Sequence, residues 1–344
     1  MSSPAPSPAL FFDTMGAYQR TEALRAAVAL DLFSKIARGA KSPEQLGTAC
    51  EASARGVRIL CDYLTILGFL QKTGTSYDLT EDSKVFLVRE SPAYLGGTID
   101  FLLTPHIRDS FQLLTDAVKR GGTAMSDEGT VSHDNPVWVD FARAMAPMMH
   151  LPAKLLTNLV ASEVGKDSGS TDRPLRVLDI AAGHGFYGIA VAERFKNAHV
   201  TALDWANVLA VAQENAGRAG LTGRYTLMPG SAFEVPWGGP YDVVLLTNFL
   251  HHFDIPTCEQ LAKLAFNALA PGGRAFTLEF IPSPDRISPP PTAVFALTML
   301  ATTAKGDAYT FAEYDGIFKA AGFARSEFHA LPPTMQQAVV SYKN

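Results

Sequence analysis

Between residues 175 and 282 the chain alternates short apolar runs with segments of helical length. The runs LRVLDIAA, AHVTALDW, YDVVLLTNF and RAFTLEFIP have the length and composition of buried strands. Segments such as GIAVAERFKN and IPTCEQLAKLAFNALA separate them. This alternation predicts an α/β fold with a doubly wound, mostly parallel sheet, and it places a ligand site at the carboxyl ends of the strands.

The amino-terminal hundred residues predict a second, mostly helical domain. Apolar spacing indicates one helix over residues 21–39, a second that begins after the cap residue Ser42, and a third over 53–70. Two short strands around Gly74 and another helix near Thr80 follow. Three helices and a hairpin are the pattern of a winged helix, a fold that often binds DNA.

Charge and apolar patterning favour a different use for this domain. Residues 1–100 carry ten Lys/Arg against eleven Asp/Glu, whereas DNA binding needs an excess of cations. The third helix is apolar on more than one face, which suits a core or a subunit interface better than a DNA groove. We interpret residues 1–100 as a dimerisation module and keep a winged-helix regulator as a minor alternative.

Composition limits the remaining possibilities. A chain of 344 residues with 47% hydrophobic content and a net charge of −5 fits a soluble protein of more than one domain, without a nucleic-acid or membrane partner. Its three cysteines form no CxxC pair, which favours reduced thiols and a cytoplasmic location. The opening MSSPAPSPALFF has no signal-peptide pattern and is expected to be a loose arm.

Residues 101–170 are expected to be helical and to connect the two domains. Met145, Met148 and Met149 lie beside Phe141, and such a methionine stripe serves either as core or as the lining of a pocket. The polar stretch GKDSGSTDRP at 165–174 predicts a linker.

The stretch VLDIAAGHGFYG reads G-x-G-x-x-G from Gly183 to Gly188, and Asp204 follows sixteen residues later. A lone match of this kind is weak evidence for a dinucleotide such as NAD. Asp179 lies within the preceding strand, where a buried charge is costly without a partner. A carboxylate there can bind an ammonium group or order the loop. The cationic amino-acid end of S-adenosylmethionine fits this position better than a pyrophosphate does.

The heptapeptide NFLHHFD follows the apolar run YDVVLLT. His251 and His252 admit three interpretations: a metal site, a catalytic base, or polar residues at a strand end. The metal site is disfavoured, because neighbouring side chains diverge and no other His/Cys cluster lies nearby in the sequence. Asp254, before IPTCEQ, is expected to cap a helix.

These motifs, in this order, resemble a known family. VLDIAAGHG, LD, GSAF, NFLHHFD and LAPGGRAFTLEFIP are similar to class I S-adenosylmethionine-dependent methyltransferases. The amino-terminal domain resembles the winged-helix dimerisation domain of small-molecule O-methyltransferases, and the resemblance covers about residues 10–342. It implies a Rossmann-like, seven-stranded catalytic domain at 171–344, a homodimer, and a connector at 101–170 that contributes to the substrate pocket.

The resemblance also implies an EC 2.1.1 activity. The methyl group of S-adenosyl-L-methionine would pass to a hydroxyl of an aromatic or polyketide-like small molecule, with S-adenosyl-L-homocysteine as product. A C- or N-methyltransferase of the same fold remains an alternative, and an NAD-dependent dehydrogenase is a weak one.

For the cofactor, the resemblance implies that the glycine loop wraps the methionine part and that Asp204 holds the ribose. Ala181 stands where the family pattern has its first glycine, and Ser231 stands where an adenine-contacting aspartate is usual. The implied cofactor-binding residues are Asp179, Ala181, Gly183, Gly185, Asp204, Trp205, Gly230, Ser231, Ala232, Phe233 and Asn248.

For catalysis, the family motif L-H-D-W aligns with Leu250 to Phe253, so that His251 matches the base. Glu279, in the next strand, matches the glutamate that orients this histidine. A second family glutamate is replaced by Ala308, and whether Asp307 substitutes for it is left open. The implied substrate-binding residues are Met145, Met149, His252, Phe295 and Met299, and no metal is expected.

Overall fold

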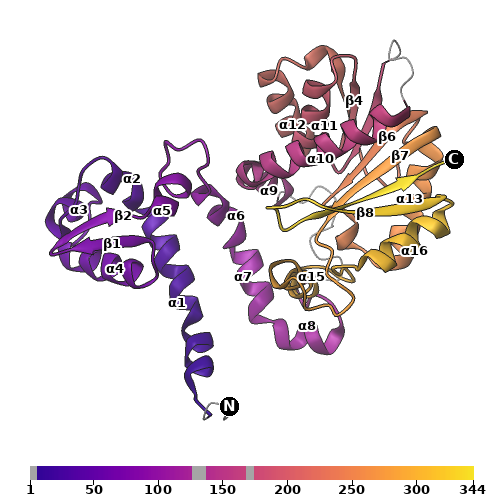
Figure 1. Ribbon diagram of the computed structural model, residues 1–344. Coiled ribbons are helices and arrows are strands. Elements are labelled where there is room, and N and C mark those ends of the chain that lie inside the picture. The colour runs from indigo at the N-terminus through magenta and orange to yellow at the C-terminus, as the bar shows by residue number, and fades with distance from the viewer. Residues whose placement is uncertain (1–5, 126–136, 168–173) are drawn as a thin grey trace. The chain divides into compact units, whose positions relative to one another are not determined.

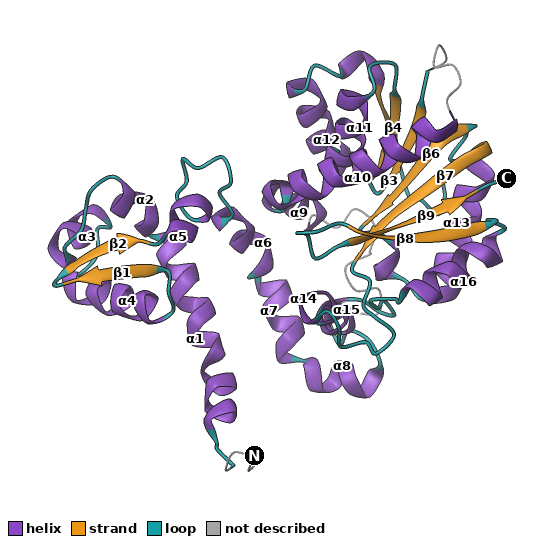
Figure 2. Cartoon of the chain, viewed as in Figure 1, coloured by secondary structure: helices purple, strands orange, loops and turns teal. Residues whose placement is uncertain are grey.

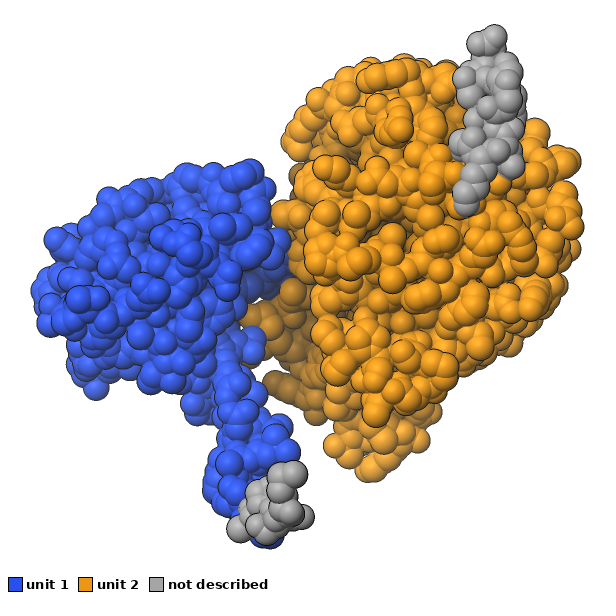
Figure 3. Space-filling view, viewed as in Figure 1, with its two compact units in different colours: residues 1–100 blue, residues 101–344 orange. Residues whose placement is uncertain are grey.

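The computed structural model describes residues 6–125, 137–167 and 174–344. The chain divides into two compact units, residues 1–100 and 101–344 (Figure 3). The first five residues of the expected amino-terminal arm lie outside the described residues, as do residues 168–173 of the expected linker. Helix α10 continues to Asp167, so the first three residues of that linker are helical instead.

The amino-terminal unit combines helices with one antiparallel hairpin (Figure 2). Its elements are α1 (Ala9–Ala29), α2 (Leu32–Ala37), α3 (Pro43–Ala49), α4 (Ala54–Ile66), β1 (Leu70–Thr73), β2 (Ser76–Leu79), α5 (Glu81–Phe86) and the 3-10 turn η1 (Gly96–Thr98).

Side-chain caps begin three of these helices at the residues the sequence predicted or close to them. Ser42 forms a capping box with Gln45 at the start of α3, the Ser53 hydroxyl accepts from the Gly56 N–H at 3.0 Å, and Thr80 caps α5. Such caps satisfy N–H groups that the helix leaves unpaired.

Two helix boundaries differ from the prediction. The helix expected at 21–39 is two helices, because Asp31 adopts a left-handed φ of 52° that a right-handed helix cannot include. The helix expected over 53–70 ends at Ile66, since Gly68 has φ +87° and Leu70 already belongs to β1. The apolar periodicity of the sequence continues across both breaks, so the periodicity alone did not predict them.

The second unit is a seven-stranded sheet covered by helices on both faces (Figure 1). The strand order is β5-β4-β3-β6-β7-β9-β8; all pairs are parallel except those of β9, which runs antiparallel to both neighbours. This confirms the predicted α/β class and its mostly parallel sheet. The strands are β3 (Arg176–Ile180), β4 (His199–Asp204), β5 (Tyr225–Pro229), β6 (Tyr241–Thr247), β7 (Leu269–Glu279), β8 (Arg325–Ala330) and β9 (Gln337–Tyr342).

The helices of this unit come before and between the strands. They are α6 (Ile99–Leu102), which begins at the end of the first unit, α7 (Pro105–Gln112), α8 (Leu114–Arg120), α9 (Val137–Ala144), α10 (Ala146–Asp167), α11 (Phe186–Arg194), α12 (Ala206–Arg218), α13 (Ile255–Ala268), α14 (Pro290–Ala293), α15 (Phe295–Thr302) and α16 (Phe311–Ala321). Two short 3-10 turns, η3 (Thr222–Arg224) and η4 (Leu250–His252), precede β5 and follow β6.

Alternate residues of the central strands pack in two separate hydrophobic cores. On β3, Val177 packs in the core that includes residues of α10, α11 and α12. Its neighbour Leu178 packs in the core that includes residues of α13 and α16. A strand buried on both faces has no polar side, which explains its continuous apolar run.

One loop prediction in this unit needs correction. Pro271, Gly272 and Gly273 were expected between a helix and a strand, but β7 begins earlier, at Leu269. The register against β6 shifts there, so these residues form an irregular part of the strand. Two further helices, α14 and α15, meet at Val294. Within the described residues, no helix is long and apolar enough to cross a membrane.

Candidate active site

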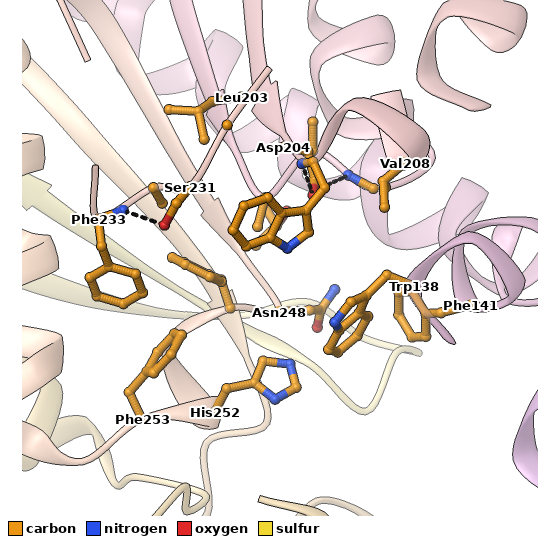
Figure 4. Close-up of a pocket in the computed structure, with 18 of the residues that line it drawn as sticks. Trp138, Phe141, Leu203, Asp204, Val208, Ser231, Phe233, Asn248, His252 and Phe253 are labelled. Carbon is orange, nitrogen blue, oxygen red and sulfur yellow. Dashed lines mark hydrogen bonds between the residues drawn. The ribbon is translucent and has the colours of Figure 1, made fainter. Parts of the chain in front are cut away.

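A cavity of about 500 Å³ opens at the carboxyl ends of β3, β4, β5 and β6 (Figure 4). This is the edge where ligands bind in parallel α/β sheets. The predicted site residues on its wall are Ala181, Gly183, Asp204, Trp205, Gly230, Ser231, Ala232, Phe233, Asn248 and His252. The structure therefore brings together most of the predicted cofactor residues.

The loop from β3 to α11 forms one wall through left-handed backbone. Ala181, Gly183 and Gly185 have φ of 52°, 58° and 78°, a region that costs a non-glycine residue energy. A Cβ on Gly183 would meet no atom within 3.8 Å, since the nearest is 3.9 Å away. A side chain at Gly183 would therefore project into the open volume, so its absence leaves space for a ligand against the backbone. Gly185 starts α11 and is not on the wall.

Asp179 lies behind this loop, fully buried and away from the cavity wall. Its Oδ2 accepts from the Gly188 N–H at 3.0 Å, and a Cβ on Gly188 would come within 2.8 Å of that oxygen. Oδ1 has no hydrogen-bond partner among the described residues. Burial raises the pKa of Asp179 to about 8. Through this hydrogen bond from Gly188, the carboxyl group of Asp179 orders the loop.

Asp204, the last residue of β4, lies at the cavity wall with both carboxylate oxygens engaged by backbone. Oδ2 accepts from the Gly183 N–H at 2.8 Å and Oδ1 from the Trp205 N–H at 2.7 Å. Burial raises the pKa of Asp204 to about 6, and the two N–H groups oppose that rise. Asp204 thus fixes the glycine loop relative to the neighbouring strand.

The turn after β5 supplies a third wall. Ser231 Oγ accepts from the Phe233 N–H at 3.2 Å (Figure 4). The ring of Phe233 meets that of Phe253 edge-on, with centroids 5.2 Å apart. These rings make this end of the cavity apolar and aromatic.

Asn248, directly after β6, is held in a left-handed conformation with φ 53°. Its Nδ2 donates to the Tyr187 hydroxyl at 3.1 Å, and its Oδ1 accepts from Gln336. Tyr187 in turn donates to the sulfur of Met149 at 3.3 Å. Met149 is therefore not on the wall itself but supports a tyrosine that is.

His251 and Glu279 form a buried pair. The distance from His251 Nδ1 to Glu279 Oε2 is 2.5 Å, and the two residues are 4% and 0% exposed. Glu279 Oε1 accepts from the backbone N–H groups of Phe249, Leu250 and His251, at 2.9, 2.9 and 3.4 Å. Parallel pairing of β6 with β7 matches Thr247 to Leu278, which brings the ends of the two strands together.

His252, and not His251, is on the cavity wall. Its ring lies edge-on to Trp138, with centroids 5.2 Å apart (Figure 4). His252 Nδ1 has no hydrogen-bond partner within the described ranges. Burial, together with the neighbouring His251, lowers the pKa of His252 well below its ordinary value, so the ring is neutral.

Asp254 caps α13 as expected, since its Oδ1 accepts from the Thr257 N–H at 3.1 Å. In the parts of the chain that the structure describes, no three His, Cys, Asp or Glu residues are placed to hold a metal ion.

The remaining predicted substrate residues are not on the wall of this cavity. Met145 is buried in the core beside α10, and Met299 is buried on α15. Phe295 meets the His251 ring edge-on at 4.9 Å and stacks on Phe280 at 4.0 Å. Phe295 thus contacts the buried pair directly, without reaching the cavity.

The segment that lacks the second family glutamate does not supply another acid to His251. Ala308 is buried, and Asp307 pairs with Arg286 at 3.2 Å. A Cβ on Gly306 would come within 2.2 Å of the His251 carbonyl oxygen, so this loop packs tightly on the histidine backbone.

Several wall residues were not predicted from the sequence. Among them are Trp138, Phe141, Ala182, His184, Tyr187, Leu203, Val208, Glu234, Thr247, Phe249, Phe253 and Ala304. Trp138 and Phe141 come from α9 and Ala304 from the segment after α15, so helix packing places them. His184 did carry a signal, because it lies between two glycines of the loop.

Strand order and glycine loop together define a class I methyltransferase domain. Comparison with known proteins gives the family: residues 158–324 match the O-methyltransferase domain and residues 12–89 match the O-methyltransferase dimerisation domain. A putative O-methyltransferase from Nostoc punctiforme is 53% identical, with a TM-score of 0.94 over 98% of this chain and 100% of that one. The chain belongs to the S-adenosylmethionine-dependent O-methyltransferase family, whose members are EC 2.1.1 enzymes.

More distant relatives cover nearly the whole chain. The 3-hydroxy-5-methyl-1-naphthoate 3-O-methyltransferase of Streptomyces sahachiroi is 25% identical over 92% of this chain and 89% of its own length. The acetylserotonin O-methyltransferase of Mus musculus is 27% identical over 91% and 83%. Human N-acetylserotonin methyltransferase, solved with S-adenosylmethionine, shares the fold with a TM-score of 0.84 and 20% identity over 100% of both chains.

Proposed function

We propose that this protein transfers the methyl group of S-adenosyl-L-methionine to a hydroxyl of an aromatic or polyketide-like small molecule. His251 acts as the general base and Glu279 orients it. The observation that carries the proposal is the 2.5 Å contact between His251 Nδ1 and Glu279 Oε2 beside the cavity. A buried carboxylate in that position fixes the tautomer of the imidazole.

The pair can move a proton from the acceptor. Glu279 accepts a hydrogen bond from Nδ1–H, so the lone pair of His251 is on Nε2 and is available to a hydroxyl. A phenol with a pKa of about 10 is mostly protonated at neutral pH, and an imidazole with a pKa near 6.5 can assist its ionisation. The buried carboxylate then stabilises the imidazolium that forms.

The residues at the strand ends fit the cofactor. Gly183 leaves open volume beside the backbone, Asp204 presents a carboxylate at the wall, and Asp179 keeps an unpaired buried oxygen behind the loop. Asp204 would hold the ribose, and Ser231 with Phe233 would hold the adenine. When bound, S-adenosylmethionine supplies an electrophilic methyl group on a sulfonium, and S-adenosyl-L-homocysteine is the product.

The part of the wall formed by α9 and by the segment around η4 suits a planar, apolar acceptor. Trp138, Phe141, Phe249 and Phe253 present aromatic surface, and the neutral His252 adds a polar edge. Aromatic walls bind flat rings by stacking and exclude water. A dry site favours this transfer, since a cationic donor and an anionic acceptor lose their charges together.

Two measurements test the proposal. Calorimetry should show binding of S-adenosylmethionine and none of NAD, and the opposite result would overturn the cofactor. A screen of phenols and hydroxylated polycyclic compounds with methyl-labelled cofactor should then give O-methyl products. Cofactor binding with transfer to amine or carbon acceptors alone would reject hydroxyl transfer.

Two observations favour the second candidate, a C- or N-methyltransferase. His251 is recessed behind the wall formed by His252, and Ala308 occupies the position of the second family acid. An acceptor that needs no deprotonation would require neither group. The labelled-cofactor screen includes amines and activated aromatic carbons for this reason.

We also propose that residues 1–100 form a homodimer interface, that residues 101–170 form a connector and that residues 171–344 bind the cofactor. The support is the match to the dimerisation domain and the apolar surface of α1. Leu10, Phe11, Phe12, Met15 and Tyr18 are each more than 60% exposed. So many exposed apolar side chains on one helix are unusual on a monomer.

Sedimentation of the full chain tests the dimer. We expect wild type to sediment as a dimer and the double variant Phe11→Asp/Phe12→Asp to dissociate into monomers. The matched control Lys84→Asp, at an exposed position of α5, should remain dimeric. Monomeric wild type at micromolar concentration would contradict the interface.

A further inference from the structure

His184 is a buried side chain in the cofactor loop for which the proposed chemistry gives no role. It stands between Gly183 and Gly185, both left-handed, and its side chain and backbone are almost completely buried, with 3% exposed. Its carbonyl accepts from Asn215 Nδ2 at 2.9 Å. The backbone on either side is therefore fixed, and the position of the ring is determined by its neighbours.

The ring is held in one orientation. Its plane stacks on Phe186, with centroids 4.8 Å apart, and it lies tilted against Tyr187 at 5.7 Å. His184 Nδ1 accepts a hydrogen bond from the Phe186 N–H at 3.1 Å. An acceptor nitrogen carries no proton, so the single proton of the neutral ring is on Nε2.

The other ring nitrogen, Nε2, carries a proton for which the described residues provide no acceptor. His184 is on the wall of the cavity, and none of the hydrogen bonds among the described residues involves Nε2. The described part of the chain offers this N–H no acceptor, so water or a ligand in the cavity must provide one. Its presence at a cavity wall points to a ligand that supplies an acceptor.

We propose that His184 Nε2–H donates to the carboxylate of the methionine end of S-adenosylmethionine. The inference rests on the proposed cofactor and names one of its contacts. A donor excludes the ammonium and sulfonium groups, which have no hydrogen-bond acceptor to offer. Asp204, at the end of the next strand, is the group suited to the ribose hydroxyls. The carboxylate is the remaining strong acceptor at the end of the cofactor that the glycine loop contacts.

The electrostatic setting supports a neutral donor. Burial, with a smaller contribution from His150, lowers the pKa of His184 to about 3. The ring therefore stays uncharged, with its proton on Nε2, throughout the pH range of an ordinary assay. Asp179 and Asp204, the titrating carboxyls at the same loop, change the charge of the site without changing this donor.

Two substitutions separate the two nitrogens of the ring. His184→Asn keeps an acceptor near the position of Nδ1, which preserves the bond from the Phe186 N–H, but it has no donor near Nε2. His184→Gln places an amide N–H near the position of Nε2. Calorimetry of the full-length protein would use S-adenosylmethionine and its decarboxylated analogue, which lacks only the carboxylate.

We expect His184→Asn to weaken binding of S-adenosylmethionine roughly tenfold or more, the usual scale of a lost hydrogen bond to a charged group. Its affinity for the decarboxylated analogue should equal that of wild type, and His184→Gln should recover part of the loss. Equal weakening of both ligands by His184→Asn would overturn the proposal, because it would indicate damage to the loop.

If wild type binds neither S-adenosylmethionine nor its decarboxylated analogue, the proposed function itself is contradicted, independently of the role of His184. Nitrogen-15 spectra of the histidine rings give a readout independent of turnover. The His184 signals should show a protonated Nε2 that is unchanged between pH 5 and 8 and that shifts on binding S-adenosylmethionine. A protonated Nδ1 would contradict the assigned donor.

Discussion

Two carboxyl groups are fully buried at the carboxyl edge of the same sheet, and their surroundings differ. Glu279, at the end of β7, meets three backbone N–H groups and an imidazole. Asp179, near the end of β3, meets one N–H, and its second oxygen has no partner among the described residues. The protein alone supplies hydrogen-bond partners to both oxygens of Glu279, whereas one oxygen of Asp179 lacks a partner among the described residues.

The contrast separates two tasks within one site. A carboxyl group that positions a base must be held in place before any ligand arrives, and the fold surrounds Glu279 with hydrogen-bond donors. A group near a cationic cofactor gains most of its favourable interactions only after binding, which is consistent with the raised pKa of Asp179. Burial alone therefore does not define the environment of a carboxyl group; the number of hydrogen-bond donors around it distinguishes Glu279 from Asp179.

The largest expected effect comes from changing the satisfied carboxylate. Glu279→Gln removes the charge that stabilises the imidazolium of His251 while keeping the size of the side chain. We expect the turnover number to fall by about 100-fold or more, with the affinity for S-adenosylmethionine unchanged. Steady-state kinetics and calorimetry check this, and normal turnover in Glu279→Gln would remove the basis for the orienting role.

The second largest expected effect is the dependence of protein stability on pH that Asp179 causes. Its folded pKa of about 8 lies above the unfolded value near 3.8, so the folded state binds the extra proton between these limits. Stability of the cofactor-free protein should therefore fall as pH rises, by at most about 1.4 kcal/mol per pH unit from this group. Asp204, with a pKa of about 6, contributes mainly below pH 6.

Asp179→Asn isolates this contribution, because the amide is neutral at every pH. Denaturant unfolding of the cofactor-free protein between pH 6 and 8 should show a smaller slope of stability against pH in the variant than in wild type. Parallel slopes for the two proteins would mean that Asp179 is already ionised without a ligand, and the contrast with Glu279 would disappear.

The smallest expected effect is at Ala181, where the family pattern has glycine. A φ of 52° strains an alanine by about 1 kcal/mol, and this offsets the conformational entropy that glycine costs. Ala181→Gly should therefore leave the melting temperature unchanged or slightly higher. The neighbouring control Ala182→Gly, whose φ is not positive, should lower it. A clear loss in Ala181→Gly would show that the loop is unstrained.

Local features of the sequence predicted much of this structure. Ser42 and Asp254 were identified as caps because capping depends on residues within one helical turn. The proximity of His251 and Glu279 followed from the family motif, and parallel pairing of β6 with β7 accounts for it. Interactions between adjacent strands are the non-local contacts that sequence order constrains most.

The rest of the site depends on packing between distant segments. Trp138 and Ala304 reach the cavity wall from α9 and from the loop after α15, and no local pattern fixes where those segments lie. The expected pocket residues Met145 and Met299 are buried instead, because an apolar side chain satisfies a core and a pocket equally well. The unused donor of His184 depends on the ring orientation, which the packing of Phe186 and Tyr187 determines.

The most direct test of the catalytic assignment compares the two adjacent histidines in the transfer reaction. With the accepted substrate and saturating methyl-labelled cofactor, single-turnover rates would be measured for wild type, His251→Ala and His252→Ala. We predict that His251→Ala loses about 100-fold or more of the rate with normal cofactor affinity. His252→Ala should retain the rate at saturation and weaken acceptor binding. A normal rate in His251→Ala, with the loss appearing in His252→Ala, would contradict the account.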